Sequence, residues 1–239
     1  MRTEEKAILQ SFFVPSVALA IMYLVKLTEW LFHLNFSSFG IHPLHAEGLP
    51  GIILSTFIHA DWQHLAANSV PLLVLGAALY HFYRPLATKI AAMIILITGL
   101  WVWVGARGGY HIGASGLIYG LATFLLVSGF IRRETRLMAL SLIVVFLYGS
   151  FVWGIFPEFF PKKNISWEGH LSGMIAGLIL AVFYKNEGPQ RKPFIWEDAA
   201  NTDDDNDTDE KNDAEKPYWD VPEPDQKDLT VVYHPGRKS

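Results

Sequence analysis

The chain has 239 residues, 51% of them hydrophobic, and a formal net charge of −4. Most acidic residues follow position 185, so the apolar content is concentrated before it, as in a membrane protein with a polar tail. The absence of cysteine excludes disulfide frameworks and thiolate metal sites, and the charge pattern does not suggest nucleic-acid binding.

The first predicted element is an apolar run at Phe12–Phe32, which follows a charged N-terminal segment, residues 1–11. About 20 apolar residues are enough for a helix to cross the hydrocarbon core, so this run is predicted to span the membrane. A cleaved secretory signal is the alternative, but it would have a shorter apolar core and a small-residue cleavage site. Lys26 and Glu29 inside the run are interpreted as an ion pair near the membrane interface, with no assigned chemistry.

Residues 33–56 combine apolar side chains with scattered prolines and glycines. The segment is too broken for a helix and too apolar for a solvated loop, so we expect it to lie in or on the bilayer surface. Two roles stay open for it: an ordinary long loop packed on the bundle, or a gate for substrate.

Five further apolar runs follow, with boundaries that are predicted to within several residues. They are His64–Tyr83, Lys89–Val104, Ala114–Ile131, Leu137–Phe156 and Trp167–Tyr184. Each run is continuous rather than alternating in polarity, and backbone groups in lipid must be satisfied within the segment, so each is predicted to be a helix rather than a barrel strand. The predicted fold class is therefore all-α: a transmembrane bundle of six spans over residues 12–185.

The polar tail, residues 186–239, is rich in Asp, Asn and Pro and cannot bury a core, so it is predicted to be disordered. A role in docking a partner stays open.

Basic residues predict the orientation, because Lys and Arg are in excess on the cytoplasmic side. If the chain has six spans, ten Lys and Arg residues fall on one side of the membrane: Arg2, Lys6, Arg84, Lys89, Arg132, Arg133, Arg136, Lys185, Arg191 and Lys192. The opposite connections carry Arg107, Lys162 and Lys163, with Lys26 near the end of the first span. Both termini, including residues 1–11 and the tail, are therefore predicted to be cytoplasmic, and residues 33–56 to face outward.

Polar residues inside the spans are candidates for function because they are costly in lipid. His64 and Asn68 are four apart and share a helix face. Ser115 and Tyr119 share a face of the fourth predicted span.

Small residues form an edge on each of two spans, which lets helices approach closely. Gly116 and Gly120 form one edge beside Ser115, while Gly173 and Gly177 form the other beside His170. If the two edges pack together, Ser115 and His170 come within hydrogen-bond reach.

That pair has the chemistry of acyl transfer, because a serine hydroxyl needs a base and neutral imidazole can accept its proton. The developing oxyanion needs donors, which the Ser115 amide, the Asn68 side chain and a ring N–H of His64 can supply. The residues thus predict a Ser115–His170 catalytic dyad.

These residues resemble the rhomboid family of intramembrane serine proteases, in its six-span bacterial form. The family has a histidine and an asparagine on the second span, Gly-x-Ser-Gly at the start of the fourth, and His-x2-Gly-x3-Gly on the sixth. Here the three motifs read HADWQHLAAN, GASGLIYG with Gly113 first, and GHLSGMIAG.

The resemblance implies the same dyad and oxyanion hole, with Tyr119 stacked beneath His170. It further implies a water-accessible cavity that opens outward, no metal or cofactor, residence in the bacterial inner membrane, and membrane-spanning protein substrates. Many members carry a Trp-Arg pair in the loop after the first span, and residues 33–56 contain no Arg, so we expect the loop to be anchored differently.

Two other functions stay open. One is a catalytically inactive relative that binds transmembrane clients, although such relatives usually lack the serine or the histidine. The other is a small-solute transporter, which would give the Gly-Ala-Ser-Gly motif no special task. The sequence carries no signal for the natural substrate or the oligomeric state.

Overall fold

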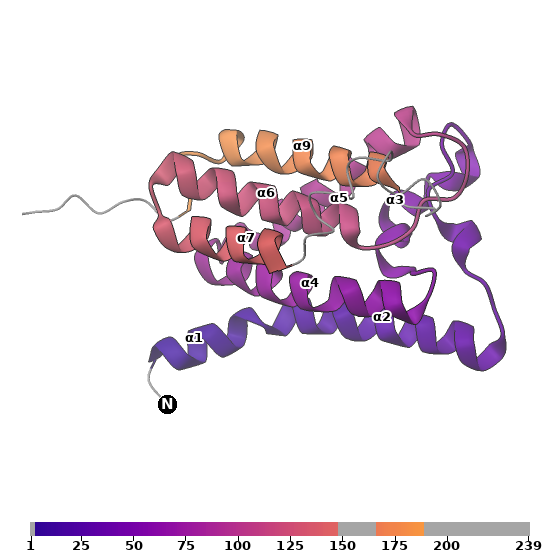
Figure 1. Cartoon of the computed structure of the whole chain (residues 1–239), viewed down its shortest axis with the longest axis horizontal. Helices are drawn as coiled ribbons and strands as arrows, with labels where there is room; N and C mark the ends of the chain where they lie inside the picture. The colour runs from indigo at the N-terminus through magenta and orange to yellow at the C-terminus, as the bar shows by residue number, and fades with distance from the viewer. Residues whose placement is uncertain (1–2, 148–165, 189–239) are drawn as a thin grey trace, which may run out of the picture. The chain divides into compact units, whose positions relative to one another are not determined.

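The computed structural model describes residues 3–147 and 166–188, and these are helical apart from turns, loops and one isolated bridge. The predicted all-α class is confirmed. The main helices are α1 (Thr3–Ser11), α2 (Phe13–Phe32), α4 (Trp62–Phe82), α5 (Ala87–Gly105), α6 (Ser115–Arg132), α7 (Thr135–Leu147) and α9 (Trp167–Phe183). Figure 1 shows α2 beside α4 and α6 beside α9, with α7 in view between α4 and α6, and α4 also contacts α6.

Within residues 3–147 and 166–188, four helical segments are long and apolar enough to cross a membrane: Glu5–Phe32, α4, α5 and α6. The shorter apolar helices α7 and α9 lie where the fifth and sixth spans are predicted. The remainder of the fifth predicted span, after Leu147, and the tail from residue 189 lie outside the described residues. The count of six spans therefore stays a prediction.

The first predicted run, Phe12–Phe32, matches α2 (Phe13–Phe32) to within one residue, but the sequence predicted no helix before it. Helix α1 already begins at Thr3, and only a short break at Phe12 separates it from α2. Glu, Lys, Ala, Leu and Gln dominate α1, and these residues favour helix regardless of polarity. The Arg84 side chain donates to Gln10 Oε1 over 2.6 Å, which ties α1 to the end of α4.

The segment at residues 33–56 has no long helix, as predicted, but it contains short helical turns that the sequence did not indicate. They are η1 (Ser37–Phe39), η2 (Ala46–Gly48), α3 (Gly51–Leu54) and η3 (Ser55–Phe57). The prolines and glycines interrupt the helix without preventing single turns.

Main-chain bonds and a tryptophan anchor this loop to the end of α5 and to the α5–α6 connection. Ile41 pairs with His111 in an antiparallel bridge, with N–O distances of 3.0 and 2.9 Å. Leu44 N donates to Trp103 O over 2.9 Å, and the Trp103 indole donates to His45 O over 3.0 Å. The loop is thus held without an arginine of its own.

Helices α6 and α9 make the most extensive contact among the described helices, and glycines make it possible. A Cβ atom on Gly173 would lie 2.1 Å from Gly116 O, and one on Gly177 would lie 2.2 Å from Gly120 O. The two backbones therefore touch where any side chain would separate them. The predicted packing of the two glycine edges is confirmed.

We expect Gly173→Val to lower the free energy of unfolding by about 1–3 kcal/mol, because the added side chain overlaps the α6 backbone. Gly105→Val is the control, since a Cβ at Gly105 meets nothing within 4 Å. Thermal unfolding in detergent measures both variants. Equal melting temperatures for the two would contradict close backbone packing.

Candidate active site

Ser115 is the first residue of α6, and a tight turn places it there. Gly113 has a φ of 115°, a left-handed conformation that favours glycine, and its N–H donates to Ser55 O over 2.8 Å. The first amides of a helix have no partner within the helix. The Ser115 amide is therefore among the donors available at this helix terminus, beside its own hydroxyl.

His170 lies in the first turn of α9 and faces Ser115 across the glycine contact. Its Nε2 atom is 2.9 Å from Ser115 Oγ, so the hydroxyl can donate to a neutral imidazole protonated at Nδ1. The Tyr119 ring stacks on the imidazole, with centroids 4.2 Å apart and an interplanar angle of 11°. The stacked tyrosine and the contact with Ser115 thus fix the orientation of the histidine ring.

The N-terminus of α9 is fixed by contacts with the segment that precedes Ser115. The Ser166 hydroxyl caps α9 by accepting from Gly169 N over 3.2 Å, and it lies 2.7 Å from His111 Nδ1. Arg107 and the buried Glu168 form an ion pair of 2.9 Å. One short connection therefore positions both helices that carry the serine–histidine pair.

His64 and Asn68 lie on α4, which packs against α6. The His64 ring lies beside Gly113, since a Cβ there would be 2.7 Å from Cε1. Asn68 is buried one helical turn further on, and its Nδ2 atom has no hydrogen-bond partner within the described part of the chain. A buried amide donor without a protein partner is rare in folded proteins, so it is a donor that a water, an ion or another ligand can use.

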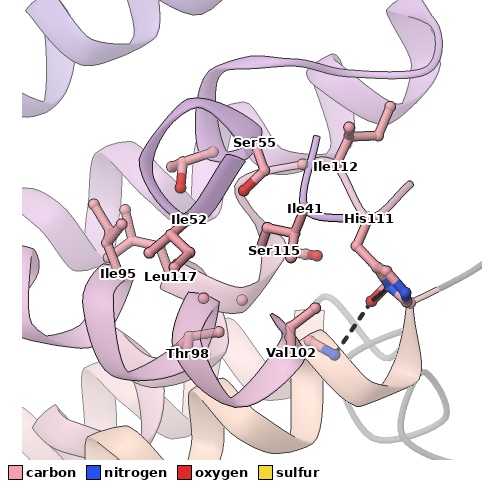
Figure 2. Close-up of a pocket in the computed structure, with 16 residues that line it drawn as sticks. Ile41, Ile52, Ser55, Ile95, Thr98, Val102, His111, Ile112, Ser115 and Leu117 are labelled. Carbon is pink, nitrogen blue, oxygen red and sulfur yellow. Dashed lines mark hydrogen bonds between the residues drawn. The ribbon is translucent and has the colours of Figure 1, made fainter. Parts of the chain in front are cut away.

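A cavity of about 40 Å³ adjoins Ser115 on the side of residues 33–56 (Figure 2). Ser55 and Thr98 line it together with apolar residues such as Ile52 and Val102. The Thr98 hydroxyl is buried without a hydrogen-bond partner in the described structure. The cavity has polar groups in its lining and is large enough for water, which needs about 10–15 Å³ of such volume.

His59, for which the sequence predicted no role, lies beside the site. Its ring is buried, its Nε2 atom accepts from Ala114 N over 3.4 Å, and its centroid is 5.1 Å from that of His64. The signal was a histidine just before an apolar span, five residues from His64, but spacing alone did not show that its ring turns inward. The expected Lys26–Glu29 ion pair is present at 3.1 Å.

The described residues define an integral membrane protein, a helical bundle that encloses a serine–histidine pair. The family model for the rhomboid domain matches residues 47–187. The chain therefore belongs to the rhomboid family.

Several similar proteins align with this chain over most of its membrane part. An uncharacterized protein of Mycobacterium tuberculosis is 40% identical over 179 residues, which cover 72% of this chain and 74% of that protein. An uncharacterized protein of Mycobacterium leprae is 37% identical over 189 residues, 76% and 74% of the two chains. A putative rhomboid protein of Acanthamoeba polyphaga mimivirus is 31% identical over 139 residues, 55% of this chain and 73% of that protein.

Burial lowers the pKa of His59 to about 4 from its ordinary value of 6.5. As the pH falls below 6.5, the unfolded chain binds a proton that the folded chain binds only near pH 4, so this residue makes the fold less stable over that interval. We expect His59→Gln to lose less stability than the wild type between pH 7 and pH 4, measured as the melting temperature in detergent. His81→Gln, at an exposed position, is the control. Parallel loss in the wild type and His59→Gln would contradict the burial of a neutral histidine.

Proposed function

We propose that the protein is an intramembrane serine endopeptidase with Ser115 as nucleophile and His170 as base. The observation that carries this proposal is the 2.9 Å contact between His170 Nε2 and Ser115 Oγ. This is the distance at which a base accepts the proton of a serine hydroxyl. The expected substrates are membrane-spanning proteins that are cut within or near their transmembrane segments.

The reaction follows from the chemistry of the dyad. Ser115 Oγ attacks the scissile carbonyl carbon while His170 Nε2 takes its proton, and a tetrahedral oxyanion forms. His170 then gives the proton to the leaving amine, which leaves an acyl-enzyme. Water attacks that ester with the same histidine as base, releases the acid and restores Ser115.

Three groups are suited to stabilise the oxyanion: the Ser115 amide, Asn68 Nδ2 and a ring N–H of His64. The buried Asn68 donor lacks a partner among the described residues, which supports a role that is fulfilled only during the reaction. The cavity beside Ser115 supports access of the hydrolytic water.

An inactive relative that binds transmembrane clients is the second candidate. It would not require a serine hydroxyl within hydrogen-bond distance of an imidazole that is stacked on a tyrosine. The preserved geometry therefore favours the protease.

We expect Ser115→Ala and His170→Ala each to abolish cleavage of a transmembrane reporter by the protein in detergent or proteoliposomes. The first variant removes the nucleophile and the second removes the acceptor for its proton. Ser172→Ala, partly buried two residues beyond His170 on α9, is the control and should cleave like the wild type. Undiminished cleavage by either dyad variant would refute the assignment.

We expect Asn68→Ala to lower kcat by about 10²- to 10³-fold, because one of several oxyanion donors is lost. Gln63→Ala, on an exposed face of α4, should leave kcat unchanged. Steady-state kinetics with the same reporter give both values. An unchanged kcat in Asn68→Ala would exclude the side chain from the oxyanion hole.

The proposed orientation puts residues 33–56 outside the cell and both termini inside, in a bacterial inner membrane. Because the chain has no cysteine, single cysteines report the side directly. We expect a membrane-impermeant maleimide to label Ser38→Cys in intact cells and Asn186→Cys only after lysis. The reverse pattern would overturn the orientation that the basic residues predict.

A further inference from the structure

The Lys26–Glu29 pair is a buried ion pair on a helix that otherwise exposes large apolar side chains. The relative exposure of the two side chains is 13% and 6%, whereas Phe13, Leu24 and Trp30 on α2 are each more than 60% exposed. A buried ion pair adds little net stability, because desolvation offsets the attraction between the charges. Its other contacts therefore indicate its role.

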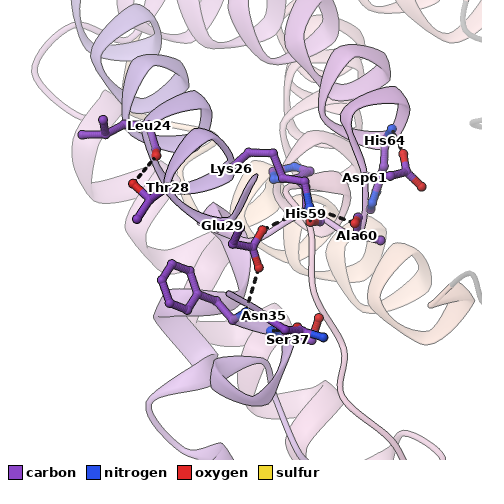
Figure 3. A network of polar contacts seen from close by, with 11 residues as sticks. Leu24, Lys26, Thr28, Glu29, Asn35, Ser37, His59, Ala60, Asp61 and His64 are labelled. Atoms are coloured by element: carbon purple, nitrogen blue, oxygen red, sulfur yellow. Dashed lines mark hydrogen bonds and ion pairs between the residues drawn. The ribbon is translucent and has the colours of Figure 1, made fainter. Parts of the chain in front are cut away.

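Lys26 fixes the main chain just before α4. Its ammonium group donates to Glu29 Oε2 over 3.1 Å, to His59 O over 3.0 Å and to Ala60 O over 2.9 Å (Figure 3). Three acceptors match the three protons of an ammonium group. The other Glu29 oxygen accepts from Phe36 N over 2.7 Å, so the pair also holds the start of the loop after α2.

The main chain that Lys26 holds belongs to a histidine that reaches the nucleophile's turn. The His59 ring accepts from the N–H of Ala114, the residue before Ser115, and it packs on the His64 ring in a T-shaped arrangement with an interplanar angle of 67°. Asp61 Oδ1 accepts from His64 N over 2.7 Å and so fixes the first turn of α4. Contacts therefore run from Lys26 through His59 to two proposed oxyanion donors. One contact reaches Ala114, next to the Ser115 amide, and the other reaches the His64 ring.

We infer that Lys26 and Glu29 are positioning residues for the oxyanion hole. Lys26 holds the carbonyl groups of His59 and Ala60, and the His59 ring in turn holds Ala114 and His64. Stabilisation of an oxyanion depends on donors that are in place before charge develops, and small displacements weaken it. This inference rests on the proposed protease function.

The experiment compares three variants with the wild type in detergent: Lys26→Met, Lys26→Arg and Glu29→Gln. Lys26→Met keeps the apolar stem and removes the donors, and we expect kcat for a transmembrane reporter to fall about 10- to 100-fold with little change in KM. Lys26→Arg restores donors and should recover most of that loss. Glu29→Gln keeps an acceptor for Phe36 N and should lower kcat less than Lys26→Met does. Thr28→Val is the matched control, because the Thr28 hydroxyl donates to Leu24 O on its own helix and makes no other side-chain hydrogen bond within the described residues.

A second measurement distinguishes an effect of the variant on the oxyanion hole from an effect on substrate entry or on folding. The rate constant for labelling of Ser115 by a small fluorophosphonate also depends on the oxyanion donors, but this reaction does not require a substrate helix to enter the active site. We expect this rate constant, per folded active site, to fall in parallel with kcat in Lys26→Met. An unchanged labelling rate, or a loss only of KM or of the folded fraction, would overturn the inference.

Two further outcomes are distinguished from a failure of this inference: an inactive wild type and a Lys26→Met variant that does not fold. If the wild type neither cleaves the reporter nor reacts with the probe, the proposed function itself fails. If Lys26→Met does not fold, Glu29→Gln decides: a lowered kcat and labelling rate at unchanged KM supports the positioning role, and wild-type values refute it.

Discussion

The contact between the α6 and α9 backbones at Gly116 and Gly173 is the constraint on which the site depends. The two helices approach until a carbonyl of one occupies the place of a side chain on the other. In lipid there is little hydrophobic force to press helices together, so such close packing supplies much of their association. The same approach sets Ser115 Oγ 2.9 Å from His170 Nε2.

The segments that connect the helices also hold the site residues in place. The segment between α5 and α6 bonds to residues 33–56 through Ile41 and to the start of α9 through His111 and Ser166. The Lys26–Glu29 pair joins α2 to the segment before α4. Each of these links lies near the helix termini that carry the polar residues, so the site is held at one end of the bundle.

The sequence predicted those features of the fold that depend on a regular pattern of residues. Continuous apolar runs indicated the helices α4, α5, α6 and α9 to within two residues, because a span in lipid must satisfy its own backbone. Glycines spaced by four predicted the α6–α9 contact, and the motif residues around them led to Ser115 and His170. The start of α1 was missed because polar helix formers leave no apolar signal.

Long-range polar contacts were less predictable. Lys26 and Glu29 are three apart, so their pairing could be inferred, but the bonds to His59 and Ala60 join residues more than thirty positions away. No periodicity encodes such a bond, and the direction of the His59 ring is set by packing.

The most direct measurement is mass-spectrometric mapping of the adduct formed when the purified protein reacts with a fluorophosphonate. A Ser115–His170 dyad predicts a single stoichiometric adduct on Ser115 in the wild type and none in His170→Ala. A protein that reacts at another serine, or equally well without His170, would contradict the dyad.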